Sequence, residues 1–212
     1  MEKLLQQLEP YLFSILIVGM NVVFIGVAAL VSYQQRQSTV RAWDDFAMRT
    51  GLTLHKGSFF TTPSLSGDYR QRPVRVYLFS RGSSRSRTTY TGIDLTVNNT
   101  TGSTLGLSPS SAVGDFFGKL FSTQDVQTGN LEFDARFTVK SQPPDFAVAA
   151  FDDSMVRMGL MEVDGYFHIS LQGSSMVYTE RGRLRDSTRL EKLVNTLSDL
   201  ADRVEGKKKG SF

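Results

Sequence analysis

The stretch YLFSILIVGMNVVFIGVAALVSY, residues 11–33, contains twenty-three residues and no charged side chain. A helix that crosses a bilayer needs about 20 apolar residues, whereas the apolar region of a secretory signal is only about 7 to 15 residues long. The ten residues before the stretch carry Lys3 beside Glu2 and Glu9, so they lack the positive charge that opens a signal peptide. Length and flanking charge therefore predict an uncleaved transmembrane helix; cleavage after small residues such as Val27 and Ala29 is the alternative.

The positive charges around this stretch predict its orientation. Only Lys3 lies on the N-terminal side, whereas Arg36, Arg41 and Arg49 follow on the C-terminal side. Because positive residues near a span favour the cytoplasmic side, the larger part of the chain is expected in the cytoplasm, at the inner face of the cytoplasmic membrane. The alternative is a signal anchor with the domain outside, and the absence of cysteine fits either compartment.

Small and polar residues form two lines along the predicted span. At 100° per residue, Ser14, Asn21 and Ala28 fall on one line, while Gly19 and Gly26 fall on another. Amides that bond across to another helix, and small residues that let backbones approach, both favour helix association in a bilayer. The pattern predicts packing against a second copy or a subunit of a larger membrane complex. The alternative is that Asn21 is simply tolerated there.

One soluble domain is expected after the span. We assign residues 1–10 to a short leading segment, 11–33 to the membrane helix, 34–206 to the domain and 207–212 to a basic tail. A net charge of +3 over 212 residues is modest, so the chain does not have the basic balance typical of a nucleic-acid binder.

The membrane helix is expected to continue into the domain as one rod. Between the span and Gly51 no residue strongly breaks a helix, and glycine is a common helix stop. Val40, Trp43, Phe46 and Ala47 recur at three- and four-residue spacing, which predicts an apolar stripe packed on the domain.

Alternating residues predict an antiparallel sheet. The segment LEFDARFTVK, residues 131–140, alternates apolar and polar side chains throughout and carries the strongest strand pattern of the chain. Shorter alternations involve the apolar sets Val74, Val76 and Leu78; Ile93, Leu95 and Val97; and Phe167, Ile169 and Leu171. Because the strands are not alternated with helices, we expect an α+β fold with about six or seven antiparallel strands packed by helices.

Two helices are expected in the second half of the domain. Residues 143–159 begin with two prolines suited to a first turn and end at Gly159. The final helix is expected to begin near Thr188, which has capping-box spacing to Glu191, and to end at Gly206.

Residues suited to catalysis or metal binding are few. There is no cysteine, and the two histidines, His55 and His168, lack any metal-ligand spacing; His168 is expected on the exposed face of its strand. The segment GDFFGK, residues 114–119, has one residue too few for a phosphate-binding loop and lacks its Ser or Thr. No metal or cofactor is therefore expected.

Carboxylates offer the remaining catalytic possibility. A pair with separated pKa values can act as general acid and base, and the candidates are Asp125, Asp134, Asp152 and Asp153. Their spacing does not single out a pair, so solvated charges are the favoured interpretation. A carboxylate-based hydrolase is an alternative function.

A run of arginines follows the first predicted strands. The segment RQRPVRVYLFSRGSSRSR, residues 70–87, contains no acidic residue and six arginines: Arg70, Arg72, Arg75, Arg81, Arg85 and Arg87. Together with Lys207, Lys208 and Lys209 they are candidates for binding the anionic surface of the membrane or a phosphate ligand. The alternative is a solvated hairpin without a ligand.

Three loose motifs carry a resemblance. Trp43, Phe46-Ala47 and Gly51-Leu52 are followed by GDYRQRPV at residues 67–74 and TGNLEFDARF at residues 128–137. This order resembles a set of uncharacterised bacterial proteins, many of which have an N-terminal membrane helix. Asn130 departs from the Asp that often follows the glycine of the third motif. The resemblance implies a membrane-associated domain without a known activity, so the expected function is a single-pass, non-catalytic accessory or interaction protein.

Overall fold

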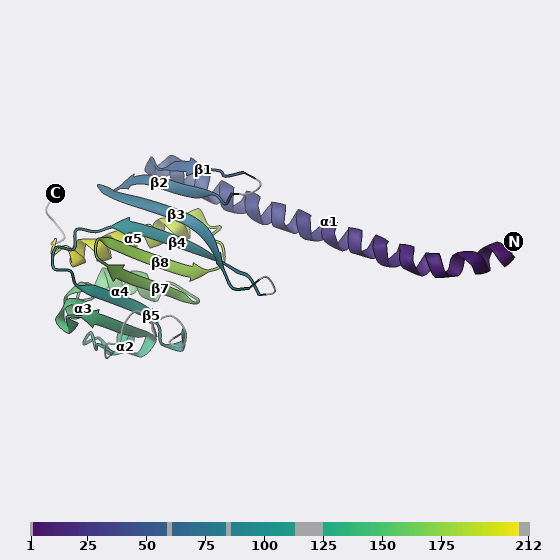
Figure 1. Ribbon diagram of the computed structural model, residues 1–212. Helices are drawn as coiled ribbons and strands as arrows, with labels where there is room; N and C mark the ends of the chain where they lie inside the picture. Colours follow the sequence, from purple (N-terminus) through teal and green to yellow (C-terminus); the bar gives the residue numbers. More distant parts are fainter. Residues whose placement is uncertain (1, 59–60, 84–85, 113–124, 208–212) are drawn as a thin grey trace.

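The computed structural model describes residues 2–58, 61–83, 86–112 and 125–207. Helix α1 runs without a break from Glu2 to Thr50, and Figure 1 shows it projecting far beyond the domain. Within it, Ser14–Thr50 is long and apolar enough to cross a membrane, and its apolar window is not buried by the domain. The prediction of one continuous rod is confirmed.

The last third of α1 belongs to the domain core. Trp43 and Phe46 are fully buried, as the apolar stripe predicted. Gly51 ends the helix with a positive φ of 76°, and its N–H donates to the carbonyl oxygen of Ala47 at 2.9 Å. A glycine is suited to this position because it adopts positive φ without a steric cost.

Eight antiparallel strands form one sheet, which confirms the α+β fold and adds one strand to the expected maximum. The strands are β1 (Thr53–His55), β2 (Ser64–Tyr69), β3 (Arg72–Arg81), β4 (Thr88–Thr96), β5 (Thr104–Pro109), β6 (Phe137–Gln142), β7 (Phe167–Gln172) and β8 (Ser175–Arg181). Their order across the sheet is β1-β2-β3-β4-β8-β7-β5-β6. A short 3-10 turn, Ser110–Ala112, follows β5.

Helices cover one face of this sheet. The domain helices are α2 (Leu131–Arg136), α3 (Pro144–Ala150), α4 (Ser154–Met161) and α5 (Ser187–Val204). Figure 1 shows α5 crossing behind the sheet. Its buried residues, including Leu190, Val194 and Leu197, meet the inward side chains of the strands, such as Ile93 and Tyr178.

The opposite face of the sheet carries a row of aromatic and small residues. Tyr77 and Phe79 lie on β3, and Phe79 stacks on its cross-strand neighbour Tyr90 with ring centroids 5.5 Å apart. The ring of Tyr77 lies over Gly92, where an added Cβ would come within 2.6 Å of it. Glycine at position 92 therefore lets the aromatic ring cover the strand.

The segment with the strongest strand pattern, residues 131–140, forms a strand only in its last part. Residues 131–136 form α2, and β6 begins only at Phe137. The Asn130 side chain caps α2 by accepting from the N–H of Phe133, and the Asp134 carboxylate accepts from the N–H groups of Thr128 and Gly129. These local hydrogen bonds favour a helical turn over an extended chain.

Two predicted helix boundaries are also wrong. The expected helix over residues 143–159 is two helices, α3 and α4, and Gly159 lies inside α4. The cap of α5 is Asp186 rather than Thr188, since its carboxylate accepts from the N–H groups of Thr188 and Arg189. Gly206 ends α5 as expected, with a positive φ of 71°.

Candidate functional site

The domain is attached to the apolar part of α1 without a flexible linker. Tyr33 ends the charge-free stretch, and Thr39 is the first α1 side chain that the domain buries, at 0% exposure. Thr39 lies six positions after Tyr33, which corresponds to about 9 Å along the helix axis. The end of the domain from which α1 leaves is therefore held close to the end of the apolar segment.

The positions predicted to pack in the membrane all lie on the surface of α1: Ser14, Gly19, Asn21, Gly26 and Ala28 are exposed. An added Cβ at Gly19 or Gly26 would meet no atom within 4 Å. The Asn21 amide donates to the Ile17 carbonyl of its own helix at 2.8 Å. Since an amide carries a second N–H and an acceptor oxygen, this bond leaves capacity for a partner helix.

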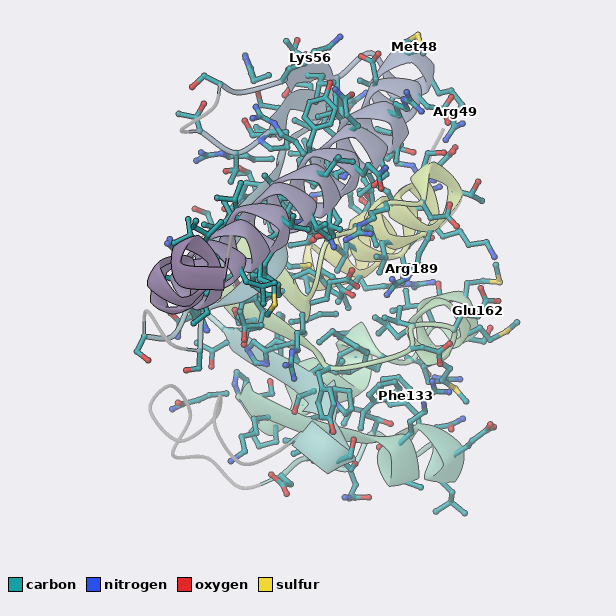
Figure 2. All side chains as sticks on the ribbon, turned by 90° about the vertical axis from the view of Figure 1, so that its right-hand side faces the viewer. Met48, Arg49, Lys56, Phe133, Glu162 and Arg189 are labelled. Atoms are coloured by element: carbon teal, nitrogen blue, oxygen red, sulfur yellow. The ribbon has the colours of Figure 1, made fainter. Side chains whose placement is uncertain are left out.

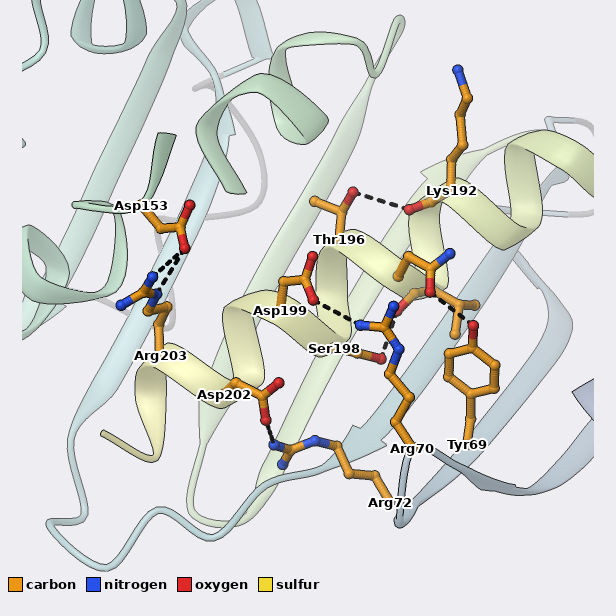
Figure 3. A network of polar contacts seen from close by, with 12 residues as sticks. Tyr69, Arg70, Arg72, Asp153, Lys192, Thr196, Ser198, Asp199, Asp202 and Arg203 are labelled. Atoms are coloured by element: carbon orange, nitrogen blue, oxygen red, sulfur yellow. Dashed lines mark hydrogen bonds and ion pairs between the residues drawn. The ribbon is translucent and has the colours of Figure 1, made fainter. Parts of the chain in front are cut away.

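The predicted arginine group is divided between two ends of the domain. Arg72 is 5% exposed and binds the carboxylate of Asp202 on α5 (Figure 3) and that of Glu205, the residue that follows α5, so it does not belong to a surface site as predicted. Arg70 pairs with Asp199 at 2.7 Å. The acidic partners of Arg72 lie about 130 residues later in the chain, so none of them is visible in the sequence around Arg72.

Glu205 organises the end of the domain opposite to the one from which α1 leaves. It accepts from Arg72, from the N–H of Asn98 at 2.8 Å and from Lys207 at 2.8 Å. Burial raises the pKa of Glu205, but these donors outweigh it and hold the pKa at about 2. Lys207 is thus engaged in this cluster, while Lys208 and Lys209 lie outside the described residues.

The other predicted arginines lie on the open face and the β3–β4 hairpin. The guanidinium of Arg75 lies 5.3 Å from the ring centroid of Tyr77, and that of Arg81 lies 5.2 Å from that of Phe79. Arg87 is exposed, and Arg85 is outside the described residues. Among the predicted anionic-surface residues that the structure describes, Arg70, Arg72, Arg75, Arg81, Arg87 and Lys207 are therefore not brought together as one patch.

The carboxylates considered for catalysis have separate structural contacts. Asp134 accepts from Thr128 and Gly129, and Asp153 caps α4 and pairs with Arg203. Asp125 lies beside Lys140, at the far end of the sheet. Asp152 is exposed and contributes its backbone carbonyl to Arg157. They do not form an acid/base pair, and the residues with described placement contain no cluster of three metal-ligating side chains.

His168 is buried, contrary to the prediction that it is exposed. It is 4% exposed, opposite Thr179 of β8. Burial, followed by the positive charge of Arg81, lowers the pKa of His168 to about 4. His55 is exposed near Ser66, so the two histidines belong to different environments. The open groove over β2, β3 and β4 is lined by Asp68, Arg75 and Asp94 but by neither histidine.

A basic segment between β8 and α5 was missed from the sequence. Arg183 and Arg185 flank Leu184, which is 1% exposed. The Leu184 carbonyl accepts from the indole N–H of Trp43 at 3.0 Å, and its own N–H donates to the Thr91 hydroxyl at 3.0 Å. The alternation RGRLR at residues 181–185 was the available signal, because a buried leucine between arginines fixes where the arginines project.

The described chain is therefore an α+β domain, with one eight-stranded antiparallel sheet, on a single N-terminal helix that can span a membrane. No protein-family model and no curated protein matches the sequence. The fold is similar to the crystal structure of the mycobacterial trehalose monomycolate transport factor A, TtfA, with a TM-score of 0.54. The match has 12% sequence identity and covers 80% of this chain and 96% of that chain. At this identity the similarity demonstrates a shared fold.

Proposed function

We propose that the protein is a single-pass, membrane-anchored, non-catalytic accessory subunit of a bacterial membrane complex, one that serves the transport of a lipid. The observation that carries the proposal is the unbroken α1, whose exposed apolar part continues directly into a buried position of the domain at Trp43. A helix of this kind fixes a domain against a membrane. The fold shared with a transport factor for a glycolipid supports the lipid-transport role.

The polar residues of the domain support a non-catalytic role. The carboxylates of Asp134 and Asp153 accept hydrogen bonds from backbone N–H groups. The ion pair between Arg72 and Glu205 holds the end of α5 against the sheet. An acid/base enzyme instead needs two titratable groups that converge on a pocket and whose pKa values are separated. Of the four carboxylates that the sequence offered for this task, Asp134 and Asp153 are occupied in the fold, and Asp125 and Asp152 do not converge with them.

The partner is proposed to be another membrane helix. Asn21 lies in the middle of the apolar stretch, where an amide facing lipid is unfavourable and one that bonds to a neighbouring helix contributes about 0.6 to 2 kcal/mol. Gly19 and Gly26 offer a second open line along the helix. The domain is proposed to lie on the cytoplasmic side because Arg36, Arg41 and Arg49 follow the span.

The proposal is tested with Asn21→Leu in the full chain in native membranes. The variant keeps the helix apolar and should insert normally, while cross-links through the span and co-purification of its partner decrease. Met20→Leu is the matched control, since residue 20 lies about 100° from the Asn21 line on the helix and faces neither seam. Unchanged cross-links in Asn21→Leu, with the same assembly size in mild detergent, would contradict the partner role of the span.

A further inference from the structure

Three connections meet at the end of the domain from which α1 leaves, which we call the anchor end. They are the β1–β2 connection beginning at Lys56, the β3–β4 hairpin, and residues 182–186 between β8 and α5. Figure 1 shows the hairpin and the β1–β2 connection pointing to the same side as α1. Figure 2 looks onto the anchor end, with α1 approaching the viewer and Lys56 at the upper edge.

Residues 182–186 are fixed firmly against α1. Trp43 holds the carbonyl of Leu184, while the Thr91 hydroxyl accepts from the Leu184 N–H and donates to the carbonyl of Gly182 at 2.9 Å. Trp43, Thr91 and Leu184 are all buried. The backbone that carries Arg183 and Arg185 is therefore held in place before any ligand binds.

Arg36 of α1 joins these two arginines. It precedes Trp43 by seven residues, which is two helical turns, so both project from the same face of α1. Its Nη2 donates to the carbonyl oxygen of Lys56 at 3.2 Å, which directs the guanidinium toward the β1–β2 connection. Burial, and then the positive charges of Arg185 and Arg36, lower the pKa of Arg183. Arg185 and Arg36 are thus both close enough to Arg183 to oppose its charge.

Their charges lack local compensation. Among the described residues, no ion pair involves Arg36, Arg183 or Arg185. The neighbouring Asp186 uses its carboxylate to cap α5, accepting from Thr188 at 2.8 Å and Arg189 at 3.1 Å. A fixed cluster of like charges is unfavourable in the isolated domain, and an anionic group would relieve this repulsion.

The cluster lies at the depth of lipid phosphates. Arg36 follows Tyr33 by three residues, or about 4.5 Å of helix. The polar layer of a bilayer is about 5 to 8 Å thick on each side of the hydrocarbon core. If residues 11–33 fill that core, Arg36 reaches the phosphate layer, and Arg183 and Arg185 lie beside it.

We propose that Arg36, Arg183 and Arg185 form a binding site for the phosphate of an anionic phospholipid in the membrane that α1 spans. Guanidinium groups bind phosphate oxygens through paired, charge-assisted hydrogen bonds. Three positive charges favour a lipid with net negative charge over a zwitterionic one, whose own cation lies beside its phosphate. The site rests on the membrane anchoring proposed above, and it would hold the anchor end of the domain against the lipid headgroups.

The test compares lipid binding by the full chain in a neutral detergent, measured by native mass spectrometry. Phosphatidylglycerol, phosphatidylcholine and inorganic phosphate are the three probes. Each basic residue near an anionic surface contributes about a five-fold factor in binding at low salt. The variant R183Q/R185Q should therefore bind phosphatidylglycerol at least five-fold more weakly than wild type, with phosphatidylcholine binding unchanged.

Two further variants separate the site from general charge and from folding. R75Q/K192Q removes the same charge from exposed side chains elsewhere on the domain, and it should keep the wild-type preference. Arg183 is half-buried, so its replacement could also affect folding. R183K keeps the positive charge at this position and should therefore keep phosphatidylglycerol binding. The site would be overturned if wild type bound the two lipids equally, or if R183Q/R185Q bound phosphatidylglycerol as strongly as wild type. It would also be overturned if wild type bound inorganic phosphate as strongly as phosphatidylglycerol. Membrane insertion, tested by resistance to alkaline carbonate extraction, would still show whether α1 anchors the protein.

Discussion

Trp43 of α1 and Leu184, which are 141 positions apart, are joined by a buried hydrogen bond from the indole N–H to the backbone carbonyl, 3.0 Å long. This bond is a direct link between the anchor helix and the connection that precedes α5. Because Trp43 is the single tryptophan of the chain, its fluorescence also reports on this contact.

Trp43→Phe should destabilise the domain by about 2 to 4 kcal/mol, because it leaves the Leu184 carbonyl unpaired and opens a cavity. The free energy of unfolding is measured by urea denaturation of the full chain in detergent, followed by circular dichroism. Tyr33→Phe, at an exposed position of the same helix, should change it by less than about 0.5 kcal/mol. A similar effect of both substitutions would mean that the link is unimportant for stability.

Arg70 and Arg72 should differ strongly although they are two residues apart. The Arg72 side chain is 6% exposed and that of Arg70 is 45% exposed. Arg72→Met leaves Glu205 and Asp202 without their main partner and should cost about 3 to 5 kcal/mol, whereas Arg70→Met should cost less than about 1 kcal/mol. Denaturation of the two variants under identical conditions gives both values, and equal losses would contradict the arrangement in Figure 3.

The buried His168 should make the domain sensitive to mild acid. Its pKa is about 4 in the fold against 6.5 for the free side chain, so the fold holds it neutral. The stability this gives is present above pH 6.5 and is lost as pH falls toward 4, by about 3 kcal/mol in total.

His168→Asn should remove this dependence. The measurement is the free energy of unfolding across that pH window, which should be nearly flat for the variant and sloped for wild type. Glu205, whose pKa is held at about 2 against 4.5, should add a second loss below pH 4.5 in both proteins. A slope between pH 6.5 and 4 that persists in His168→Asn would assign it to another group.

Gly159 should be needed for the contact between α4 and α5. An added Cβ would come within 2.4 Å of the Thr196 hydroxyl oxygen. Gly159→Ala should therefore destabilise the domain by about 1 to 3 kcal/mol, despite the better helix propensity of alanine. Combining it with Thr196→Ala should restore most of the loss, because that change removes the obstructing atoms; additive losses in the double variant would exclude a steric cause.

The orientation of the domain can be tested in spheroplasts. Protease added outside should leave the domain intact if it is cytoplasmic, as the arginines after the span predict. The intact N-terminus should also be recovered, since the anchor is expected to remain uncleaved. Digestion of the domain in intact spheroplasts would reverse the orientation, and a mature chain that starts near Leu30 would exclude the anchor.

The sequence predicted the parts of the fold that depend on local pattern. The continuous α1, its buried Trp43 and its end at Gly51 follow from helical spacing and one glycine. The segment with Phe133 and Phe137 was misassigned because these residues fit two patterns: they alternate along a strand, and they also lie four residues apart on a helix. In the structure their rings lie 4.8 Å apart, one from α2 and one from β6. Capping by Asn130 decides the outcome.

Long-range pairing was not readable from the sequence. Arg72 stands in a stretch without acids, and its partners come from the last turn of α5. His168 has the position of a wet-face residue in its strand but is covered in the fold. The candidate phosphate site likewise unites Arg36 with Arg183 and Arg185, which lie about 150 positions apart in the chain and are linked through the contact of Trp43 with Leu184.

The absence of a hinge between Tyr33 and Thr39 gives the anchor a mechanical role. A helix whose apolar length exceeds the local bilayer thickness tilts to fit, and thinner membranes demand a larger tilt. Since α1 continues into the core, the domain must follow the tilt of the span through a similar angle. Its parts farthest from α1 then travel the greatest distance, as the outer end of a lever does. The thickness of the bilayer would therefore set the angle between the sheet and a neighbouring membrane protein.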